Sequence, residues 1–173
     1  MVTRILGIDP GSRFTGFGVI DIEGNHTIHV TNGCIRIKGE TLAEKLHQIF
    51  SEIDEVITSY QPEEVSIEKV FMHKNADSAL KLGQARGVAI AACAARELAV
   101  FEYTANQIKQ ATVGKGHAKK EQVQHMVKIL LCLKEDLQAD AADALAIALC
   151  HGHSRDTLMR IEGVHGVKGG RLV

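Results

Sequence analysis

The chain has 173 residues, of which 45% are hydrophobic and 24% charged, and its formal net charge at pH 7 is −1. This composition is typical of a folded globular protein and excludes intrinsic disorder and collagen-like repeats. It also excludes a membrane span, because the longest charge-free apolar stretch, residues 87–95, is less than half of the roughly 20 residues that a spanning helix needs.

The N-terminal residues have the pattern of an antiparallel β-meander. Residues 3–9 predict a short strand, which the breaker pair Pro10-Gly11 ends. Residues 14–22 predict a second strand, and the turn at residues 23–25 leads into a third strand at 26–37. The first of these strands is expected at the centre of the sheet, with an acidic residue at its end.

A helix, a strand and a long helix follow the meander. Thr41 and Glu44 have the spacing of a capping box, and the apolar residues after them keep helical spacing up to Pro62. Residues 63–70 alternate as a strand, and residues 76–98 predict a helix built largely from Ala and Gly. Such small residues predict that this helix is either buried centrally or packed against another subunit.

The remaining elements are mostly helical. Residues 100–103 predict a last short strand, and a second capping-box pattern opens a helix at 104–113. Residues 114–120 combine Gly with Lys and predict a flexible basic loop. Two further helices are expected, at 121–133 and 139–150, with His151 and His153 capping the end of the last one.

This order of elements predicts an α/β fold with a five-stranded mixed sheet flanked by helices. Residues 1–153 are expected to form a single domain, because no repeat or linker interrupts them. Residues 154–173 are rich in Gly and lack apolar periodicity, so we expect a flexible C-terminal tail. Neither a G-x-G-x-x-G fingerprint nor a P-loop occurs in the chain.

Charge is divided unevenly along the chain. Residues 1–68 carry a net charge of −6, residues 69–134 carry +7, and residues 135–173 carry −2. A basic segment of this size neutralises phosphates if it folds onto one face, and otherwise it is a pair of solvated helices.

The cysteines and the N-terminus indicate a compartment. The 4 cysteines form no C-x-x-C pair, which favours a reduced chain over a disulfide scaffold or a zinc ribbon. The first residues lack the architecture of a signal peptide. We therefore expect a cytoplasmic protein with no membrane partner.

Four acidic residues lie inside or beside apolar runs, where an unpaired carboxylate is costly: Asp9, Glu68, Asp140 and Asp143. Asp140 and Asp143 are three residues apart, which places them on one face of a helix. Oxygen ligands without His or Cys favour Mg²⁺ or Mn²⁺ over zinc. If the four converge, two ions about 4 Å apart would serve a phosphoryl displacement.

Each carboxylate also has a structural explanation. Asp140 is a routine helix N-cap, and Asp9 is placed to cap the turn that follows it. Glu68 is placed to form an ion pair with either Arg4 or Lys69. Asp143 is the hardest to explain in this way, because the Ala-rich helix around it has a buried face.

Three segments together resemble the RuvC family of Holliday junction resolvases: LGIDPGSRFTG at 6–16, IEKVFMHKNADSALKLGQARG at 67–87 and ADAADALA at 139–146. The resemblance covers residues 3–153. It implies a ribonuclease H-like fold and a homodimer that nicks two opposing strands of a four-way DNA junction in homologous recombination and DNA repair. It also implies a divalent cation, Mg²⁺ with Mn²⁺ as substitute and two ions per subunit, and work with the RuvA–RuvB branch-migration complex.

By the same resemblance, individual residues acquire roles. The catalytic and metal-binding carboxylates are Asp9, Glu68, Asp140 and Asp143, although some relatives carry His at the last position. The basic residues that support catalysis are Lys109 and Lys120. Phe71 matches an aromatic residue that meets bases at the junction, and the basic segment supplies the other DNA contacts that we expect: Lys74, Lys81, Arg86, Lys115 and Lys119.

Three other functions remain open from the sequence. A nuclease of the same fold that acts on an RNA-containing substrate would share the carboxylates but not the segment around Phe71. An ATPase of the actin and hexokinase type needs two copies of the domain, and 173 residues hold only one. A junction-binding module without catalysis would keep the carboxylates for structure alone.

Overall fold

The computed structural model describes residues 1–69, 75–159, 167–168 and 171–172, with side chains up to residue 155. One mixed sheet contains five strands: β1 (Val2–Asp9), β2 (Phe14–Glu23), β3 (His26–Arg36), β4 (Glu64–Glu68) and β5 (Ala99–Tyr103). The helices are α1 (Leu42–Tyr60), α2 (Ala76–Ala95), α3 (Ala105–Val113), α4 (Lys120–Leu130) and α5 (Ala139–Met159). A short hairpin of β6 (Val167–Lys168) and β7 (Arg171–Leu172) follows.

The strand order is β3-β2-β1-β4-β5, which makes β1 the central strand. The first three strands pair antiparallel, and β4 and β5 continue the sheet in parallel with β1. The meander, the mixed sheet and the α/β class that the sequence predicts are thus confirmed. Because β1 and β4 run parallel, their carboxyl ends meet at one edge of the sheet.

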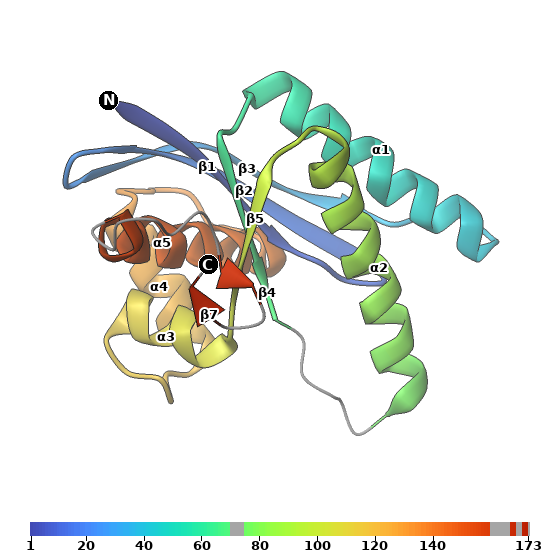
Figure 1. The fold of residues 1–173 in the computed structure, drawn as a ribbon. Coiled ribbons are helices and arrows are strands. Elements are labelled where there is room, and N and C mark those ends of the chain that lie inside the picture. Colours follow the sequence, from blue (N-terminus) through green and yellow to red (C-terminus); the bar gives the residue numbers. More distant parts are fainter. Residues whose placement is uncertain (70–74, 160–166, 169–170, 173) are drawn as a thin grey trace.

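Helices cover both faces of the sheet, with α1 and α2 on one face and α3, α4 and α5 on the other (Figure 1). Leu6 and Ile8 of β1 are buried in the core against α1 and α2, whereas Ile5 is buried with α5. Successive strand residues point to opposite faces, so the odd-numbered residues of β1 face α5.

Most helix boundaries follow the capping signals of the sequence. Both capping boxes form, at Thr41 with Glu44 and at Thr104 with Gln107. Asn75 caps α2 by accepting hydrogen bonds from two backbone N–H groups of the first turn. In the part of the chain that the structure describes, no helix is long and apolar enough to cross a membrane.

Two expectations at helix ends were wrong. The basic loop ends one residue early, because Lys119 is extended and its N–H donates to Gln122, so that Lys120 begins α4 instead of lying in the loop. The last helix runs past Cys150 to Met159, so residues 154–159 of the expected tail are helical. His151 therefore lies inside α5 and does not cap its end.

Candidate active site

The two strand carboxylates lie at the same edge of the sheet and on the same face. Ile8 of β1 pairs with Ile67 of β4, so Asp9 and Glu68 are the next residues along two adjacent parallel strands. Ser66, two residues before Glu68, donates a hydrogen bond to the carbonyl of Ile147 in α5. Since residues two apart on a strand share a face, Asp9 and Glu68 both face α5.

Helix α5 brings the other two carboxylates to this edge. Asp140 is in its first turn and Asp143 follows one turn later, among alanines that are fully buried. The N-terminal turn of a helix carries a partial positive charge, which favours carboxylates there. All four carboxylates are only partly exposed, and they lie where β1, β4 and α5 meet.

Glycines in the sheet allow this close approach of α5. A Cβ atom at Gly7 would lie closer than 3.0 Å to the Ala144 carbonyl oxygen, and one at Gly16 would overlap the Asp140 carbonyl oxygen in the same way. Real Cβ atoms do not approach other atoms so closely. The absence of side chains at these positions therefore sets how near Asp140 and Asp143 come to Asp9.

The carboxylates change one another's charge state. Burial, together with the negative charges of Asp143, Glu68 and Asp140 and against the opposing effect of Lys120, raises the pKa of Asp9 from 3.8 to about 8. Burial also raises the pKa of Asp143, in part offset by its pairing with Lys120. The site thus holds more negative charge than its own side chains neutralise.

Lys120 is the cation inside this cluster. Its Nζ lies 2.5 Å from Asp143 Oδ2, and its side chain is 54% exposed, so that it also faces solvent. Burial alone would lower the pKa of Lys120, but the pairing with Asp143 and the charges of Asp9 and Asp140 outweigh it and raise the pKa. A cavity of about 260 Å³ beside this pair is lined by both predicted catalytic lysines, Lys109 and Lys120, together with Glu68 and Asp143.

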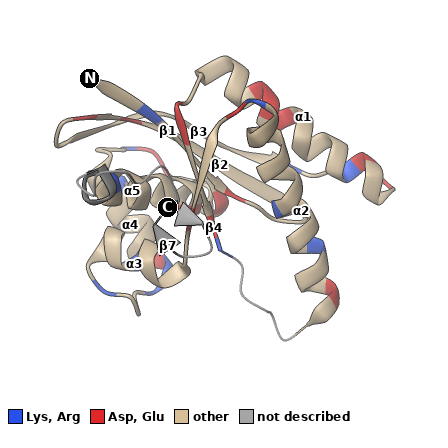
Figure 2. Cartoon of the chain, viewed as in Figure 1, with Lys and Arg blue, Asp and Glu red and all other residues tan. Residues whose placement is uncertain are grey.

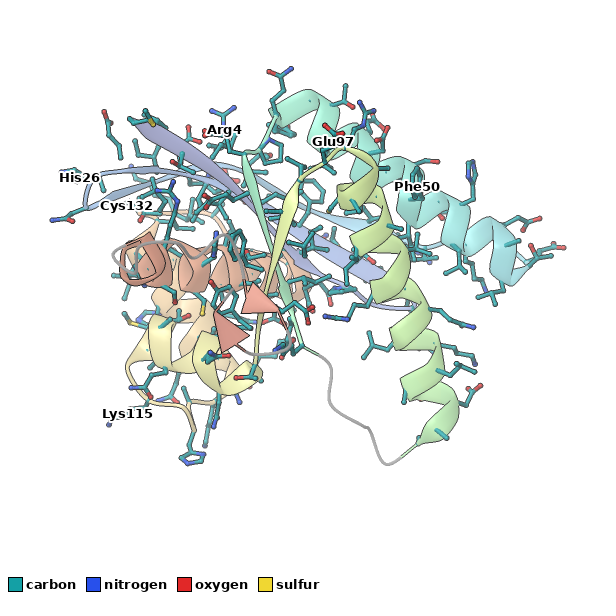
Figure 3. The ribbon with its side chains drawn as sticks, in the orientation of Figure 1. Arg4, His26, Phe50, Glu97, Lys115 and Cys132 are labelled. Atoms are coloured by element: carbon teal, nitrogen blue, oxygen red, sulfur yellow. The ribbon has the colours of Figure 1, made fainter. Side chains whose placement is uncertain are left out.

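The structure differs from two of the alternative structural roles, the pairing of Arg4 with Glu68 and the N-cap at Asp140. Arg4 pairs with Asp21 at 2.7 Å and donates to the Tyr60 carbonyl at 2.9 Å, at the end of β1 opposite Asp9 (Figure 3). The turn after Asp9 is closed by a hydrogen bond from the Thr15 hydroxyl to the carbonyl of Gly11. Asp140 is a residue within the first turn of α5.

The donor set fits a hard divalent cation, because it consists of carboxylates whose mutual repulsion a cation would relieve. No three of the described His, Cys, Asp and Glu side chains are already gathered closely enough to hold an ion. The neighbouring carboxylates disfavour the charged form of Asp9, and Lys120 holds Asp143 in an ion pair. An ion at the centre of the cluster would draw the carboxylates together.

The predicted DNA contacts are distributed over two elements on either side of the acidic cluster. Figure 2 shows basic residues along α2 and at the turn between α3 and α4. Lys115 and Lys119 lie exposed at that turn, where Figure 3 labels Lys115. Lys81 is exposed on α2 and pairs with Asp77 at 2.6 Å. Phe71 and Lys74 lie outside the described residues.

Arg86 differs from the other predicted DNA contacts, because its guanidinium is engaged within the protein. Its side chain is only 19% exposed, and it pairs with Glu102 at 2.6 Å.

The sequence did not predict the contacts of two side chains near or behind the site. Cys34 of β3 has its Sγ 3.9 Å from Asp140 Oδ2, a contact that only the sheet register reveals. His151 is 1% exposed, with Nδ1 2.7 Å from the Tyr103 hydroxyl and Nε2 2.8 Å from Glu64. The two contacts of His151 anchor the middle of α5 to β4 and β5.

Comparisons with known proteins find relatives over nearly the whole chain. The family model described as "Crossover junction endodeoxyribonuclease RuvC" matches residues 5–151. The crossover junction endodeoxyribonuclease RuvC of Hahella chejuensis is 56% identical over 169 residues, which cover 98% of each chain. That of Tolumonas auensis is 58% identical over 172 residues, 99% of each chain.

Solved structures show the same fold. The Thermus thermophilus RuvC in complex with Holliday junction substrate is 34% identical, with a TM-score of 0.83 over 90% of this chain and 96% of that one. The yeast mitochondrial Holliday junction resolvase Ydc2 shares the fold at 11% identity, with a TM-score of 0.64 over 91% of this chain and 86% of that one. Its carboxylate cluster, its ribonuclease H-like fold and these relatives together show that the chain belongs to the RuvC family of crossover junction endodeoxyribonucleases.

Proposed function

We propose that this endonuclease resolves Holliday junctions by paired nicks in opposing strands, during homologous recombination and DNA repair. The observation that carries the proposal is the cluster at the meeting point of β1, β4 and α5, where Asp9 has a pKa of about 8 and two lysines line the adjoining cavity. Groups with strongly shifted pKa values in a cavity are typical of catalytic sites.

The carboxylates Asp9, Glu68, Asp140 and Asp143 are the residues that would hold Mg²⁺, with Mn²⁺ as a substitute and two ions per subunit. Bound there, divalent ions supply an activated water and stabilise the oxyanion that leaves phosphorus. Asp9 must lose its proton to become a ligand, and Asp140 and Asp143 are brought to it by α5. Fixing these groups on two strands and one helix keeps the reacting atoms in place.

The two lysines have separate tasks in this proposal. Lys120 is half-exposed and long enough to leave Asp143 and contact a phosphate oxygen, where it would stabilise the charge that develops during the displacement. Lys109 lines the same cavity from α3, so that it lies beside the scissile phosphate when DNA enters.

Phosphate contacts outside the cluster are assigned to the basic residues on either side of it. Lys81 on α2 and Lys115 and Lys119 before α4 are exposed and supported by the net charge of +7 over residues 69–134. Lys74 belongs to the same basic segment, whereas the guanidinium of Arg86 is engaged with Glu102 and the Glu68 carbonyl. Phe71 is proposed to stack on an unpaired base at the junction centre. Such contacts follow the backbone and the shape of the junction more than its sequence.

A homodimer would give the two symmetric nicks. A four-way junction has approximate two-fold symmetry, which a C2 dimer matches with one site per opposing strand. Helix α2 offers a surface for such a contact: Gly83 and Gly87 are exposed, nothing in the described residues lies within 4 Å of a Cβ at either, and Leu80 is 62% exposed. By resemblance the partner complex is RuvA–RuvB, and the work takes place on the chromosome in the cytoplasm.

The test is cleavage of an end-labelled synthetic four-way junction in Mg²⁺, with linear duplex and an RNA–DNA hybrid of the same sequence beside it. Nicks at symmetric positions in two opposing strands of the junction, and none in the other substrates, are expected. Cleavage of the hybrid instead would assign the chain to an RNA-directed nuclease, and tight junction binding without nicks would leave a binding module.

A further inference from the structure

Arg86 of α2 reaches across to the carboxyl end of β4, where the catalytic strand ends. Its Nε donates a hydrogen bond to the backbone carbonyl of Glu68 at 3.0 Å. Its Nη2 pairs with Glu102 Oε2 of β5 at 2.6 Å. One guanidinium therefore joins α2, β4 and β5 at the residue that carries a catalytic carboxylate.

Glu68 lies at the end of β4, where the strand is paired with a neighbouring strand on one side only. Pairing with β1 runs as far as Ile67, whereas pairing with β5 continues to Glu68 and Tyr103. On the β5 side, the N–H of Lys69 donates to the Tyr103 carbonyl at 2.7 Å. The Glu68 carbonyl, which accepts from Arg86, and the Lys69 N–H belong to one planar peptide group. Because hydrogen bonds hold this group from two directions, they restrict the direction of the Glu68 side chain.

The burial of Arg86 suits an internal role better than a contact with DNA. Its side chain is 19% exposed, and two of its nitrogens already have protein acceptors, one of them charged. An exposed phosphate contact, by contrast, needs a free guanidinium face. Lys would reproduce this pair of bonds poorly, because its donors sit on one nitrogen at the end of a flexible chain, while the planar guanidinium presents donors on two nitrogens in fixed directions.

We propose that Arg86 is a positioning residue for Glu68, and that Glu102 orients Arg86 for this task. This inference rests on the proposed function, since it gives Glu68 its role in metal binding and cleavage. It assigns Arg86 an indirect part in the reaction, in place of the DNA contact that the charge pattern of the sequence favours.

The test compares Arg86→Gln, Arg86→Lys, Glu102→Gln and the double variant Arg86→Gln/Glu102→Gln with the wild type. Arg96→Gln is the matched control, because Arg96 is the C-cap residue of α2 and pairs with Asp54 of α1 instead of with the sheet. Each protein is measured for junction affinity without divalent ions, for the single-turnover nicking rate against Mg²⁺ concentration, and for Mn²⁺ affinity without DNA.

We expect Arg86→Gln to lower the nicking rate by about tenfold to a hundredfold, because a carboxylate displaced by about 1 Å loses that much. Mn²⁺ affinity falls with it, while the junction Kd stays within about twofold of the wild type. Arg86→Lys gives a loss close to that of Gln, Glu102→Gln gives part of it, and the double variant is no worse than Arg86→Gln alone. Arg96→Gln leaves rate and Mn²⁺ affinity unchanged.

Other results overturn the inference. A tenfold rise in the junction Kd of Arg86→Gln, together with tighter binding by Glu102→Gln, would show a DNA contact. Full activity of Arg86→Lys would show that only the positive charge matters, and an unchanged nicking rate in Arg86→Gln would remove the role. If the wild type itself does not nick the junction, the proposed function fails, and unchanged Mn²⁺ affinity in Arg86→Gln then decides separately against the positioning role.

Discussion

Replacing Gly16 with Ala tests whether the contact between α5 and the sheet sets the geometry of the active site. The added methyl group would lie well inside 3.0 Å of the Asp140 carbonyl oxygen, which is backbone and has no rotamer to move. To reach ordinary contact at 3.4 Å, the first turn of α5 must retreat by more than 1 Å, because close-packed interiors do not absorb such an overlap. Asp140 and Asp143 move with it.

A displacement of about 1 Å costs catalysis about a hundredfold, whereas overpacking costs about 1–3 kcal/mol of stability. We therefore expect Gly16→Ala to remain folded and to bind the junction while its single-turnover nicking rate falls by about two orders of magnitude. The assays are nicking of a labelled junction, denaturant unfolding and junction binding in parallel.

Gly18→Ala is the matched control on the same strand and face. There the new methyl group meets mainly the side chain of Leu145, with Cδ2 at 2.6 Å and the backbone nitrogen farther off at 3.0 Å, at a point of α5 beyond the carboxylates. A flexible side chain yields more easily than backbone, so we expect a similar loss of stability with less than about tenfold loss of rate. The reasoning is refuted if Gly16→Ala nicks as fast as the wild type, or if both variants lose the same activity.

Three further predictions follow from the cluster and from the anchor behind it. In the folded state Asp9 keeps its proton up to about pH 8, whereas an ordinary Asp releases it near pH 3.8. Without divalent ions, the stability of the wild type therefore falls as the pH rises between these two values. Asp9→Asn removes this part of the pH dependence, and denaturant unfolding in chelator from pH 4 to 9 measures it; equal slopes in both proteins would contradict the pKa of Asp9. Lys120→Met removes the cation beside Asp143, so nicking should fall by about a hundredfold or more with a junction Kd within a few-fold, as gel assays can show; near-normal nicking would refute the role. His151→Phe leaves the Tyr103 hydroxyl without its buried ring partner and leaves Glu64 paired with Arg155, which should cost about 1–3 kcal/mol of unfolding free energy while nicking well below the melting temperature persists; unchanged stability would show that the contacts of His151 anchor nothing.

Local patterns in the sequence were enough to predict the sheet and the elements that carry the carboxylates. Alternation, breakers and capping boxes depend on neighbouring residues, and the capping boxes at Thr41 and Thr104 form as expected. The parallel pairing of β1 with β4 then brings Asp9 and Glu68 to one edge, as their positions at strand ends indicate.

What the sequence did not reveal depends on contacts between distant segments. Gly16 reads as a residue of a strand, and only the packing of α5 shows that its missing side chain makes room for Asp140. Arg86 reads as one more cation of a basic segment, whereas in the structure it pairs with Glu102 and the end of β4. His151 follows an apolar run and suggested a helix end, but its buried partners allow a polar ring inside α5.

The most direct test of the account is metal binding by the cluster itself, measured as Mn²⁺ affinity and proton release by calorimetry at pH 7 in wild type and Asp9→Asn. The account predicts that the wild type binds Mn²⁺ and releases a proton, because Asp9 with its pKa of about 8 must ionise to become a ligand. Asp9→Asn should bind the junction with unchanged affinity, lose most of its Mn²⁺ affinity and release no proton. Equal Mn²⁺ affinity in both proteins, or nicking by Asp9→Asn at the wild-type rate, would show that the catalytic metal is held elsewhere.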